Sequence, residues 1–283
     1  METKAKARRS IITTYRKNIW RKFISAINEY ELIKDGDKIA VCISGGKDSM
    51  LLALCFQELF EHGKQNFSLE FLVMDPGYSE RNLNQIKHNA EKLGVPIKIF
   101  TSNIFEYVAG LTTGSPCYMC ARMRRGNLYA FAKELGCNKI ALGHHFNDVI
   151  ETTLLSVLYN ARFQTMMPKL KSKNFEGIEL IRPLYKVKEK DIINWREANE
   201  LIFINCACKL LEIEEDVCST ENTSKRAFVK ELVAKLKKIN PDFDNNIFTS
   251  LENVNIDATL GYIAGNKKIS FLENYDNIDG VDL

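Results

Sequence analysis

Short apolar runs that alternate with segments of helical periodicity constrain the fold of this chain more than any other feature. The runs are continuously apolar, as strands are when a sheet is covered on both faces. They are KIAVCIS (38–44), LEFLVMD (69–75), VPIKIF (95–100), NKIALG (138–143) and IELIRPL (178–184). Helical segments are expected between and after them, over 47–61, 80–93, 118–135, 148–159 and 188–199. The alternation predicts an α/β fold with a parallel sheet sandwiched by helices.

The chain is long enough for one such domain with additions. It has 283 residues, of which 45% are apolar. An apolar stripe of helical period runs through residues 6–32. We therefore expect a basic helical N-terminal arm over 1–35, an α/β domain over 36–205 and a cysteine-containing helical extension over 206–283.

The net charge of +3 is close to neutral, but the charge is unevenly distributed. Residues 1–22 hold basic side chains against the single acid Glu2, and residues 225–238 are again basic. A basic helix face is commonly just solvated, and the alternative is that it contacts phosphate. No apolar run approaches the roughly 20 residues that span a bilayer, and the N-terminus lacks the apolar core of a signal peptide. These features predict a cytoplasmic protein without a membrane segment.

The first predicted strand leads into Ser-Gly-Gly-Lys-Asp-Ser at 44–49. A Walker loop would need glycine at Val41 and a serine or threonine at Asp48, and a Rossmann fingerprint would not have adjacent glycines. The loop can still bind an anion. Gly45 and Gly46 let backbone amides approach closely, the following helix adds its dipole, and hydroxyl and ammonium donors complete the set. The donors are Ser44, Ser49 and Lys47. A plain Gly-Gly turn would not require the Lys-Asp-Ser continuation.

Two further polar segments follow predicted strands. MDPGYS contains Asp75, and LGHHFND contains Gly143, His144 and Asp148. Ligands of parallel sheets bind at the carboxyl ends of the strands, so the three loops are expected to converge on one crevice. The plainer alternative for the second segment is that its histidines are partly buried and that Asn147 or Asp148 caps the next helix.

Eight cysteines in a reducing compartment favour core positions, metal ligands or catalytic thiols over disulfides. Cys42, Cys55 and Cys137 occupy apolar segments and are expected to be core residues. The remaining ones are Cys117 and Cys120 in a CxxC motif, then Cys206, Cys208 and Cys218. Three thiolates would leave a metal site open for chemistry, whereas Cys117, Cys120, Cys206 and Cys208 together would form a closed zinc site. Both arrangements agree with the spacing.

The segment SGGKDS resembles the signature of the PP-loop ATP pyrophosphatases. The CxxC followed by RMRRG, then LGHHFNDVIET, then IRPLYKVKEKDI, is similar to the tRNA 2-thiocytidine synthetase branch of that family over residues 15–260. The resemblance implies an adenine-nucleotide α-hydrolase-like sheet and an enzyme that cleaves ATP between its α and β phosphates. A base in the tRNA anticodon loop would be adenylated at its 2-oxo group, and the oxygen would be replaced by sulfur.

The resemblance also implies roles for residues. Ser44–Ser49 would grip the pyrophosphate end of ATP, with Asp75 at the same edge, and Asp48 would help to hold Mg²⁺. Gly143 would clear space for the nucleotide, Asp148 would face the metal or the reacting centre, and His144 would lie nearby. By their own chemistry rather than by the resemblance, Arg124 and Arg125 are candidates to stabilise phosphate charge as bidentate donors, with a solvated helix face as the equal alternative. A 4Fe–4S cluster would bind Cys117, Cys120 and a third cysteine: Cys206 by alignment, with Cys208 and then Cys218 as alternatives.

Implied partners are the tRNA, a sulfur donor such as a cysteine desulfurase and a second copy of the chain. One alternative is a PP-loop enzyme that thiolates tRNA uridine or acts on another acceptor. The uridine branch usually carries extra zinc-binding cysteines at both ends, and this chain has no cysteine before Cys42 or after Cys218. Another alternative is a zinc-stabilised RNA-binding protein, which would leave SGGKDS and GHHFND unexplained.

Overall fold

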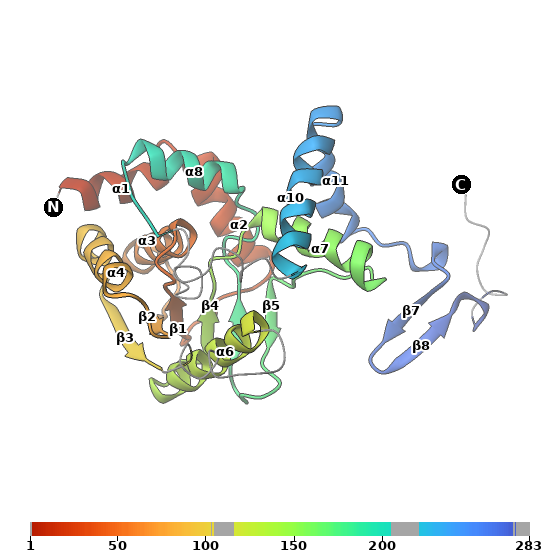
Figure 1. Ribbon diagram of the computed structural model, residues 1–283, viewed down its shortest axis with the longest axis horizontal. Coiled ribbons are helices and arrows are strands. Elements are labelled where there is room, and N and C mark those ends of the chain that lie inside the picture. The colour runs from red at the N-terminus through yellow and green to blue at the C-terminus, as the bar shows by residue number, and fades with distance from the viewer. Residues whose placement is uncertain (1, 103, 105–115, 205–220, 274, 276–283) are drawn as a thin grey trace. The chain divides into compact units, whose positions relative to one another are not determined.

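The computed structural model describes residues 2–102, 104, 116–204, 221–273 and 275. Its main sheet has the strand order β3-β2-β1-β4-β6-β5 (Figure 1). Five of these strands are parallel, which confirms the predicted fold class. They are β1 (Lys38–Cys42), β2 (Ser68–Asp75), β3 (Ile97–Thr101), β4 (Lys139–Ala141) and β6 (Glu179–Ile181).

A sixth strand, β5 (Lys169–Lys171), pairs antiparallel with β6 at the edge of the sheet. This strand was not predicted from the sequence. Its sequence is Lys-Leu-Lys, and edge strands are often short and charged, so no apolar run marks it.

Alternate residues of the central strands enter two different cores. Ile39 and Val41 pack on one face of β1, whereas Ala40 between them packs on the other. The first core contains α3 (Lys47–His62), which contacts β1 and β2, and α3 in turn contacts α8 (Glu189–Ala198). The second core is covered by α6 (Pro116–Glu134), which contacts β2 and β4 (Figure 1). The sheet is therefore covered on both faces, as its apolar strands require.

Two further helices follow strands of the parallel set. α4 (Glu80–Leu93) begins after Ser79, whose hydroxyl accepts the backbone N–H of Asn82, and it ends at Gly94 in the left-handed conformation. α7 (Phe146–Asn160) follows β4. The position of α7 matters most for the site, because its first turn starts at the carboxyl end of that strand.

The basic N-terminal segment packs onto the α/β domain. The stretch of helical period over 6–32 consists of α1 (Glu2–Ile12), a π-helical turn (Arg16–Trp20) and α2 (Arg21–Glu29). Ala7 and Ile11 are wholly buried, and Arg8 forms ion pairs of 2.6 Å with both Glu58 and Glu61 of α3. Part of the basic charge of this segment is thus committed to the protein itself.

The chain divides into two compact units, residues 1–231 and 232–283. The domain boundaries predicted at 35 and 205 stay predictions. α10 (Glu221–Ile239) begins in the first unit, and within the second unit Lys237 forms a 2.6 Å ion pair with the buried Asp244. The other elements of the second unit are α11 (Phe243–Ser250), 3₁₀ turns at Ile256–Ala258 and Phe271–Glu273, and the hairpin β7 (Gly261–Ala264) and β8 (Lys267–Ser270). Among the described residues, no helix is long and apolar enough to cross a membrane.

Trp195 of α8 anchors the N-terminal segment, which yields a stability prediction. Its side chain is wholly buried, and its indole N–H donates to the carbonyl of Ala7 at 3.2 Å. Trp195→Ala should lower the free energy of unfolding by about 3–5 kcal/mol, because it leaves a cavity in the core and removes the hydrogen bond to Ala7. Urea unfolding measures this loss. Phe60→Ala, at a side chain 53% exposed, is the control and should cost far less. Equal losses in the two variants would contradict the anchoring role.

Candidate functional site

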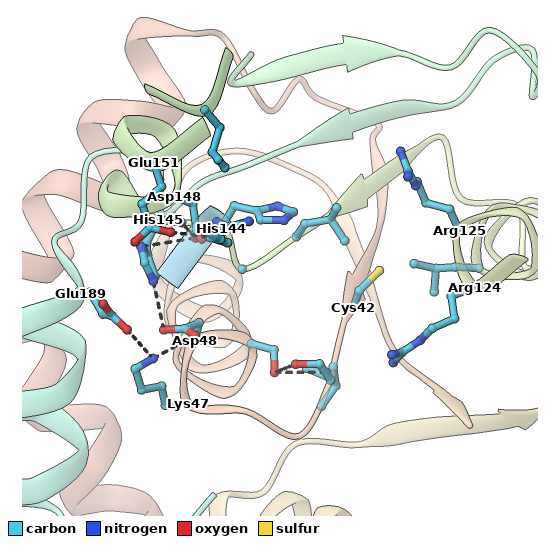
Figure 2. Close-up of a pocket in the computed structure, with 18 of the residues that line it drawn as sticks. Cys42, Lys47, Asp48, Arg124, Arg125, His144, His145, Asp148, Glu151 and Glu189 are labelled. Carbon is cyan, nitrogen blue, oxygen red and sulfur yellow. Dashed lines mark hydrogen bonds and ion pairs between the residues drawn. The ribbon is translucent and has the colours of Figure 1, made fainter. Parts of the chain in front are cut away.

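A cavity of 1210 Å³ opens beside the carboxyl ends of β1 and β4 (Figure 2). Pockets for small ligands usually measure about 300–1,000 Å³, so this one exceeds the space that a single nucleotide needs. Several separate segments of the chain contribute to its wall. The polar lining residues are Ser44, Lys47, Asp48, Ser49, Arg124, Arg125, Tyr129, His144, His145, Asp148, Glu151, Tyr159, Asn160, Glu189, Lys225, Arg226 and Lys230.

The loop after β1 has the backbone geometry of an anion-binding turn. Gly45 adopts φ 84°, and a Cβ there would lie 2.6 Å from Ile204 Cδ1, so both conformation and space require glycine. Ser49 fixes the turn: its hydroxyl accepts the backbone N–H of Ser44 at 3.1 Å and donates to the carbonyl of Gly46 at 3.0 Å. Gly46 caps α3, so the first N–H groups of that helix face the loop and favour an anion.

Asp48 holds an unsatisfied oxygen at the centre of the site. Its Oδ2 lies 3.2 Å from Lys47 Nζ, whereas its Oδ1 is buried and accepts no hydrogen bond from any described residue. His145 Nε2 lies 3.9 Å from that oxygen. Burial raises the pKa of Asp48, and the nearby His145 and Lys47 oppose the rise. A buried carboxylate oxygen without a donor is a ready ligand for a hard cation such as Mg²⁺.

Asp148 lies on the same wall as Asp48, in the first turn of α7 (Figure 2). Its Oδ2 accepts the backbone N–H of His145 at 2.9 Å and lies 3.3 Å from His145 Nδ1. The N-cap is therefore His145, and the alternative of Asn147 or Asp148 as the cap is wrong. Asn147 instead accepts the backbone N–H of Glu189 at 2.9 Å, which joins the starts of α7 and α8.

His144 lines the cavity as a neutral imidazole. Burial lowers its pKa to about 4. Arg182 Nε lies 3.4 Å from His144 Nδ1 and donates to it, which leaves the proton on Nε2.

Arg226 and Lys230 of α10 belong to the site although the sequence analysis did not select them. Arg226 pairs with Asp148 at 2.7 Å and with Glu151 at 2.9 Å. Lys230 pairs with Glu189 at 2.9 Å, and Glu189 also lies 3.3 Å from Lys47. The sequence marked 225–238 as basic, but the charge pattern alone could not show that two of its cations face carboxylates of α7 and α8.

Glu189 was likewise not selected. Burial acts to raise the pKa of Glu189, but Lys230 and Lys47 outweigh it and hold that pKa below its usual value. The residue follows the fifth predicted strand, so the rule that placed the other loops at the carboxyl edge could have found it.

The two arginines of α6 lie across the cavity from these carboxylates (Figure 2). Arg124 donates to the hydroxyl of Tyr78 at 2.9 Å, and its guanidinium lies 5.9 Å from the ring centroid of the same tyrosine. Arg125 lines the cavity and is exposed. The cavity thus has acidic groups paired with cations on one side and guanidinium groups on the other.

Not every predicted residue faces the cavity. Asp75 is buried, and one oxygen of its carboxylate accepts the backbone N–H groups of Gly77 and Tyr78 at 2.8 and 2.6 Å, which shapes the turn after β2. Asp75, Gly45 and Gly46 are not among the residues that line the cavity.

The cysteines divide into three groups. Cys55 and Cys137 are buried as predicted, while Cys42 is partly buried and also reaches the cavity wall. Cys117 and Cys120 are the second and fifth residues of α6, a spacing that puts helix positions on one face, but their side chains lie outside the description. Cys206, Cys208 and Cys218 lie outside the described residues. Within the part of the chain that the structure describes, no three His, Cys, Asp or Glu side chains form a metal-binding group.

Gly143, which follows β4, packs tightly against the loop 44–49 (the phosphate loop), and this contact yields a prediction. A Cβ at this position would lie 3.0 Å from the backbone nitrogen of Ser49 and 3.1 Å from the carbonyl carbon of Asp48. Gly143→Ala should displace the loop and weaken ATP binding about tenfold or more, as measured by calorimetry. Gly126→Ala, in α6 with open space around it, is the matched control and should leave the affinity unchanged. Unaltered ATP binding by Gly143→Ala would overturn the packing role.

A family model for the PP-loop domain matches residues 15–210. A tRNA-cytidine(32) 2-sulfurtransferase from Alcanivorax borkumensis is 34% identical over 255 residues, which cover 87% of this chain and 84% of the relative. Relatives of the same description from Bdellovibrio bacteriovorus and Neisseria meningitidis serogroup C are 36% and 38% identical over 237 residues. These matches cover 83% and 81% of this chain, and 88% and 69% of the relatives.

Among solved structures, the U34-tRNA thiolase NcsA from Methanococcus maripaludis with its [4Fe-4S] cluster has a TM-score of 0.65. The match covers 83% of this chain and 77% of that one at 22% sequence identity. At this identity the likeness supports the shared fold.

Proposed function

The chain belongs to the PP-loop family and, within it, to the tRNA-cytidine(32) 2-sulfurtransferases, and we propose that it replaces the 2-oxo oxygen of a cytidine in the tRNA anticodon loop by sulfur at the expense of ATP. The observation that carries the proposal is the pairing of an anion-binding turn with the unsatisfied Asp48 Oδ1 in one large cavity. ATP needs both features, and the remaining volume admits a base.

The first step is an adenylation. The 2-oxo oxygen of the base attacks the α-phosphorus of ATP. The bond from that phosphorus to the oxygen that bridges the α and β phosphates breaks. Pyrophosphate then leaves with the electron pair. The loop 44–49 offers backbone N–H groups and Lys47 to the pyrophosphate, and Arg124 and Arg125 face the cavity from the other side. These donors stabilise charge that develops in the transition state.

The second step exchanges the oxygen for sulfur. Sulfur at the sulfide oxidation level attacks C2 of the base, the bond from C2 to the former 2-oxo oxygen breaks, and AMP leaves with that oxygen. An anticodon-loop base can turn out of its stack to reach such a cavity, whereas a base inside a duplex cannot.

The residues around Asp48 fit Mg²⁺. Asp48 Oδ1 lacks a donor among the described residues, and Asp148 lies on the same wall. Mg²⁺ commonly takes one or two protein carboxylates and completes its shell with phosphate and water, so no group of three side chains is needed. Bound there, the ion would neutralise phosphate charge.

We propose that Cys117 and Cys120 hold a 4Fe–4S cluster. They stand three residues apart near the start of α6, the helix that also carries Arg124 and Arg125. We assign the third ligand to Cys206, with Cys208 as the alternative. A cluster held by three thiolates has one iron available to carry sulfur.

The remaining partners are proposals as well. Cys55 and Cys137 are poor sulfur donors, because burial raises the pKa of both thiols. We therefore propose that a separate protein such as a cysteine desulfurase supplies the sulfur. We also propose that the enzyme acts as a homodimer in the cytoplasm, where its tRNA substrate resides.

Nucleoside mass spectrometry tests the substrate. tRNA from cells that lack this chain should contain no 2-thiocytidine, and re-expression should restore it. Intact 2-thiocytidine in the deletion strain would refute the assignment. Loss of a thiouridine instead would support the uridine alternative.

Cysteine variants test the cluster. Cys117→Ala should abolish thiolation but leave ATP affinity within about twofold, because the phosphate loop lies on a different element. Cys206→Ala should behave in the same way and Cys208→Ala should keep activity; the reverse result would move the third ligand to Cys208.

The metal content provides an independent measurement. Protein purified without oxygen should be brown and contain about four irons per chain. A colourless protein with stoichiometric zinc would contradict the cluster and support the closed four-cysteine site.

A further inference from the structure

One face of α7 lines the cavity along its length, from the phosphate-binding end at Asp148 (the floor) to the outer end at Tyr159 (the rim). Asp148, Glu151, Leu155 and Tyr159 all line the cavity, and their spacing of three, four and four residues puts them on the same side of the helix. At a rise of 1.5 Å per residue, Tyr159 stands about 16 Å along the axis from Asp148. Tyr159 therefore belongs to the cavity but not to its phosphate-binding floor.

The aromatic ring at the rim is accompanied by a cation. The Tyr159 side chain is 44% exposed, and Lys225 Nζ of α10 lies 5.5 Å from its ring centroid. Lys225 also lines the cavity. Its neighbour Arg226 pairs with Asp148 and Glu151 deeper in the cavity, so α10 presents cations at both levels.

Backbone geometry holds Tyr159 in place. α7 ends at Ala161, a non-glycine residue in the left-handed conformation (φ 52°), and the N–H of Arg162 returns to the carbonyl of Ser156 at 3.0 Å. The hydroxyl of Thr153 in α7 donates to the carbonyl of Val149 and accepts from the hydroxyl of Thr165 at 2.9 Å, which ties the following loop back to the helix. The ring is thus carried by a fixed helical turn, as a stacking platform must be.

Apolar side chains line the cavity on both sides of β1. Leu72 and Met74 come from β2 on one side, whereas Leu142 follows β4 and Leu155 lies on α7 on the other side. An adenine bound at the loop 44–49 can use the apolar surface on the β2 side. Tyr159 lies at the far end of the face of α7 that lines the cavity, which leaves room there for a second ligand.

We propose that Tyr159 and Lys225 form a subsite for the tRNA nucleotide that flanks the reacting cytidine. The ring stacks on the flanking base, and the ammonium contacts its phosphate. Aromatic side chains and cations in this combination bind splayed-out single-stranded nucleotides. The inference rests on the proposed function and adds the place where the substrate is held next to the reacting base.

The two contacts have different salt dependence, which makes the test specific. The dissociation constant for tRNA from the deletion strain is measured over a series of salt concentrations. Tyr159→Leu keeps an apolar side chain but removes stacking, so the dissociation constant should rise about 5- to 150-fold with the salt slope unchanged. Lys225→Gln removes one phosphate contact and should reduce the slope of log K against log salt by about 0.7. Tyr159→Phe should bind tRNA as the wild type does.

Two control variants and two further measurements accompany these variants. Tyr262→Leu replaces a tyrosine of similar exposure in β7, and Lys92→Gln replaces an exposed lysine of α4; neither residue lines the cavity. Both should bind tRNA normally. ATP affinity should be unchanged in Tyr159→Leu, and its thermal midpoint should match that of Tyr159→Phe.

The failure modes are separable. If Tyr159→Leu binds tRNA with wild-type affinity, the subsite is overturned. The proposed function still stands in that case, provided that the wild-type protein thiolates tRNA. If that variant binds ATP more weakly and tRNA normally, the ring contacts adenine, and the subsite is overturned as well. Absence of thiolation by the loaded wild-type enzyme would refute the proposed function and the subsite together.

Discussion

Four carboxylates gathered around one cavity require cations, and this requirement organises the site. Asp48, Asp148, Glu151 and Glu189 come from the starts of α3, α7 and α8 and from the second turn of α7. Carboxylates that lose water are stable only when they are paired. Lys47 forms ion pairs with Asp48 and Glu189, and Lys230 forms one with Glu189. Arg226 forms ion pairs with Asp148 and Glu151. The charge balance therefore joins the phosphate loop to α10, which follows it by some 180 residues in the chain.

The parallel sheet explains why these groups meet. Each parallel strand ends at the same edge, and each is followed by a helix whose N–H groups point back toward that edge. The inner end of the cavity therefore offers backbone donors that suit a phosphate, while side chains of the same helices supply carboxylates. The tight contact of Gly143 with Ser49 and Asp48 keeps the two central loops in register. The nucleotide site and the tRNA subsite that we propose both follow from this arrangement, because one face of α7 lines the cavity along its length.

Much of the site could be predicted because its residues stand directly after apolar strands. Ser44, Lys47, Asp48, Ser49, Gly143, His144 and Asp148 were found in this way, and all of them line the cavity. Asp75 occupies an equivalent position, but its carboxylate accepts two N–H groups of the next turn, a detail that depends on local backbone geometry. His145 was interpreted as a partly buried polar residue; it is buried, and it also lies between Asp48 and Asp148.

The sequence by itself determined the parallel α/β architecture, the anion-binding turn and the motifs that identify the family, because each is encoded by neighbouring residues with a fixed period or spacing. Only the tertiary structure decided which charges meet. Arg226 and Lys230 look like any solvated basic helix in the sequence, and their pairing with α7 and α8 depends on how α10 packs across the cavity. The same holds for Tyr159 and Lys225, which are 66 positions apart and become one surface only when the two helices lie against the same cavity. Contacts between distant segments have no local signature, since they are fixed by the packing of whole elements.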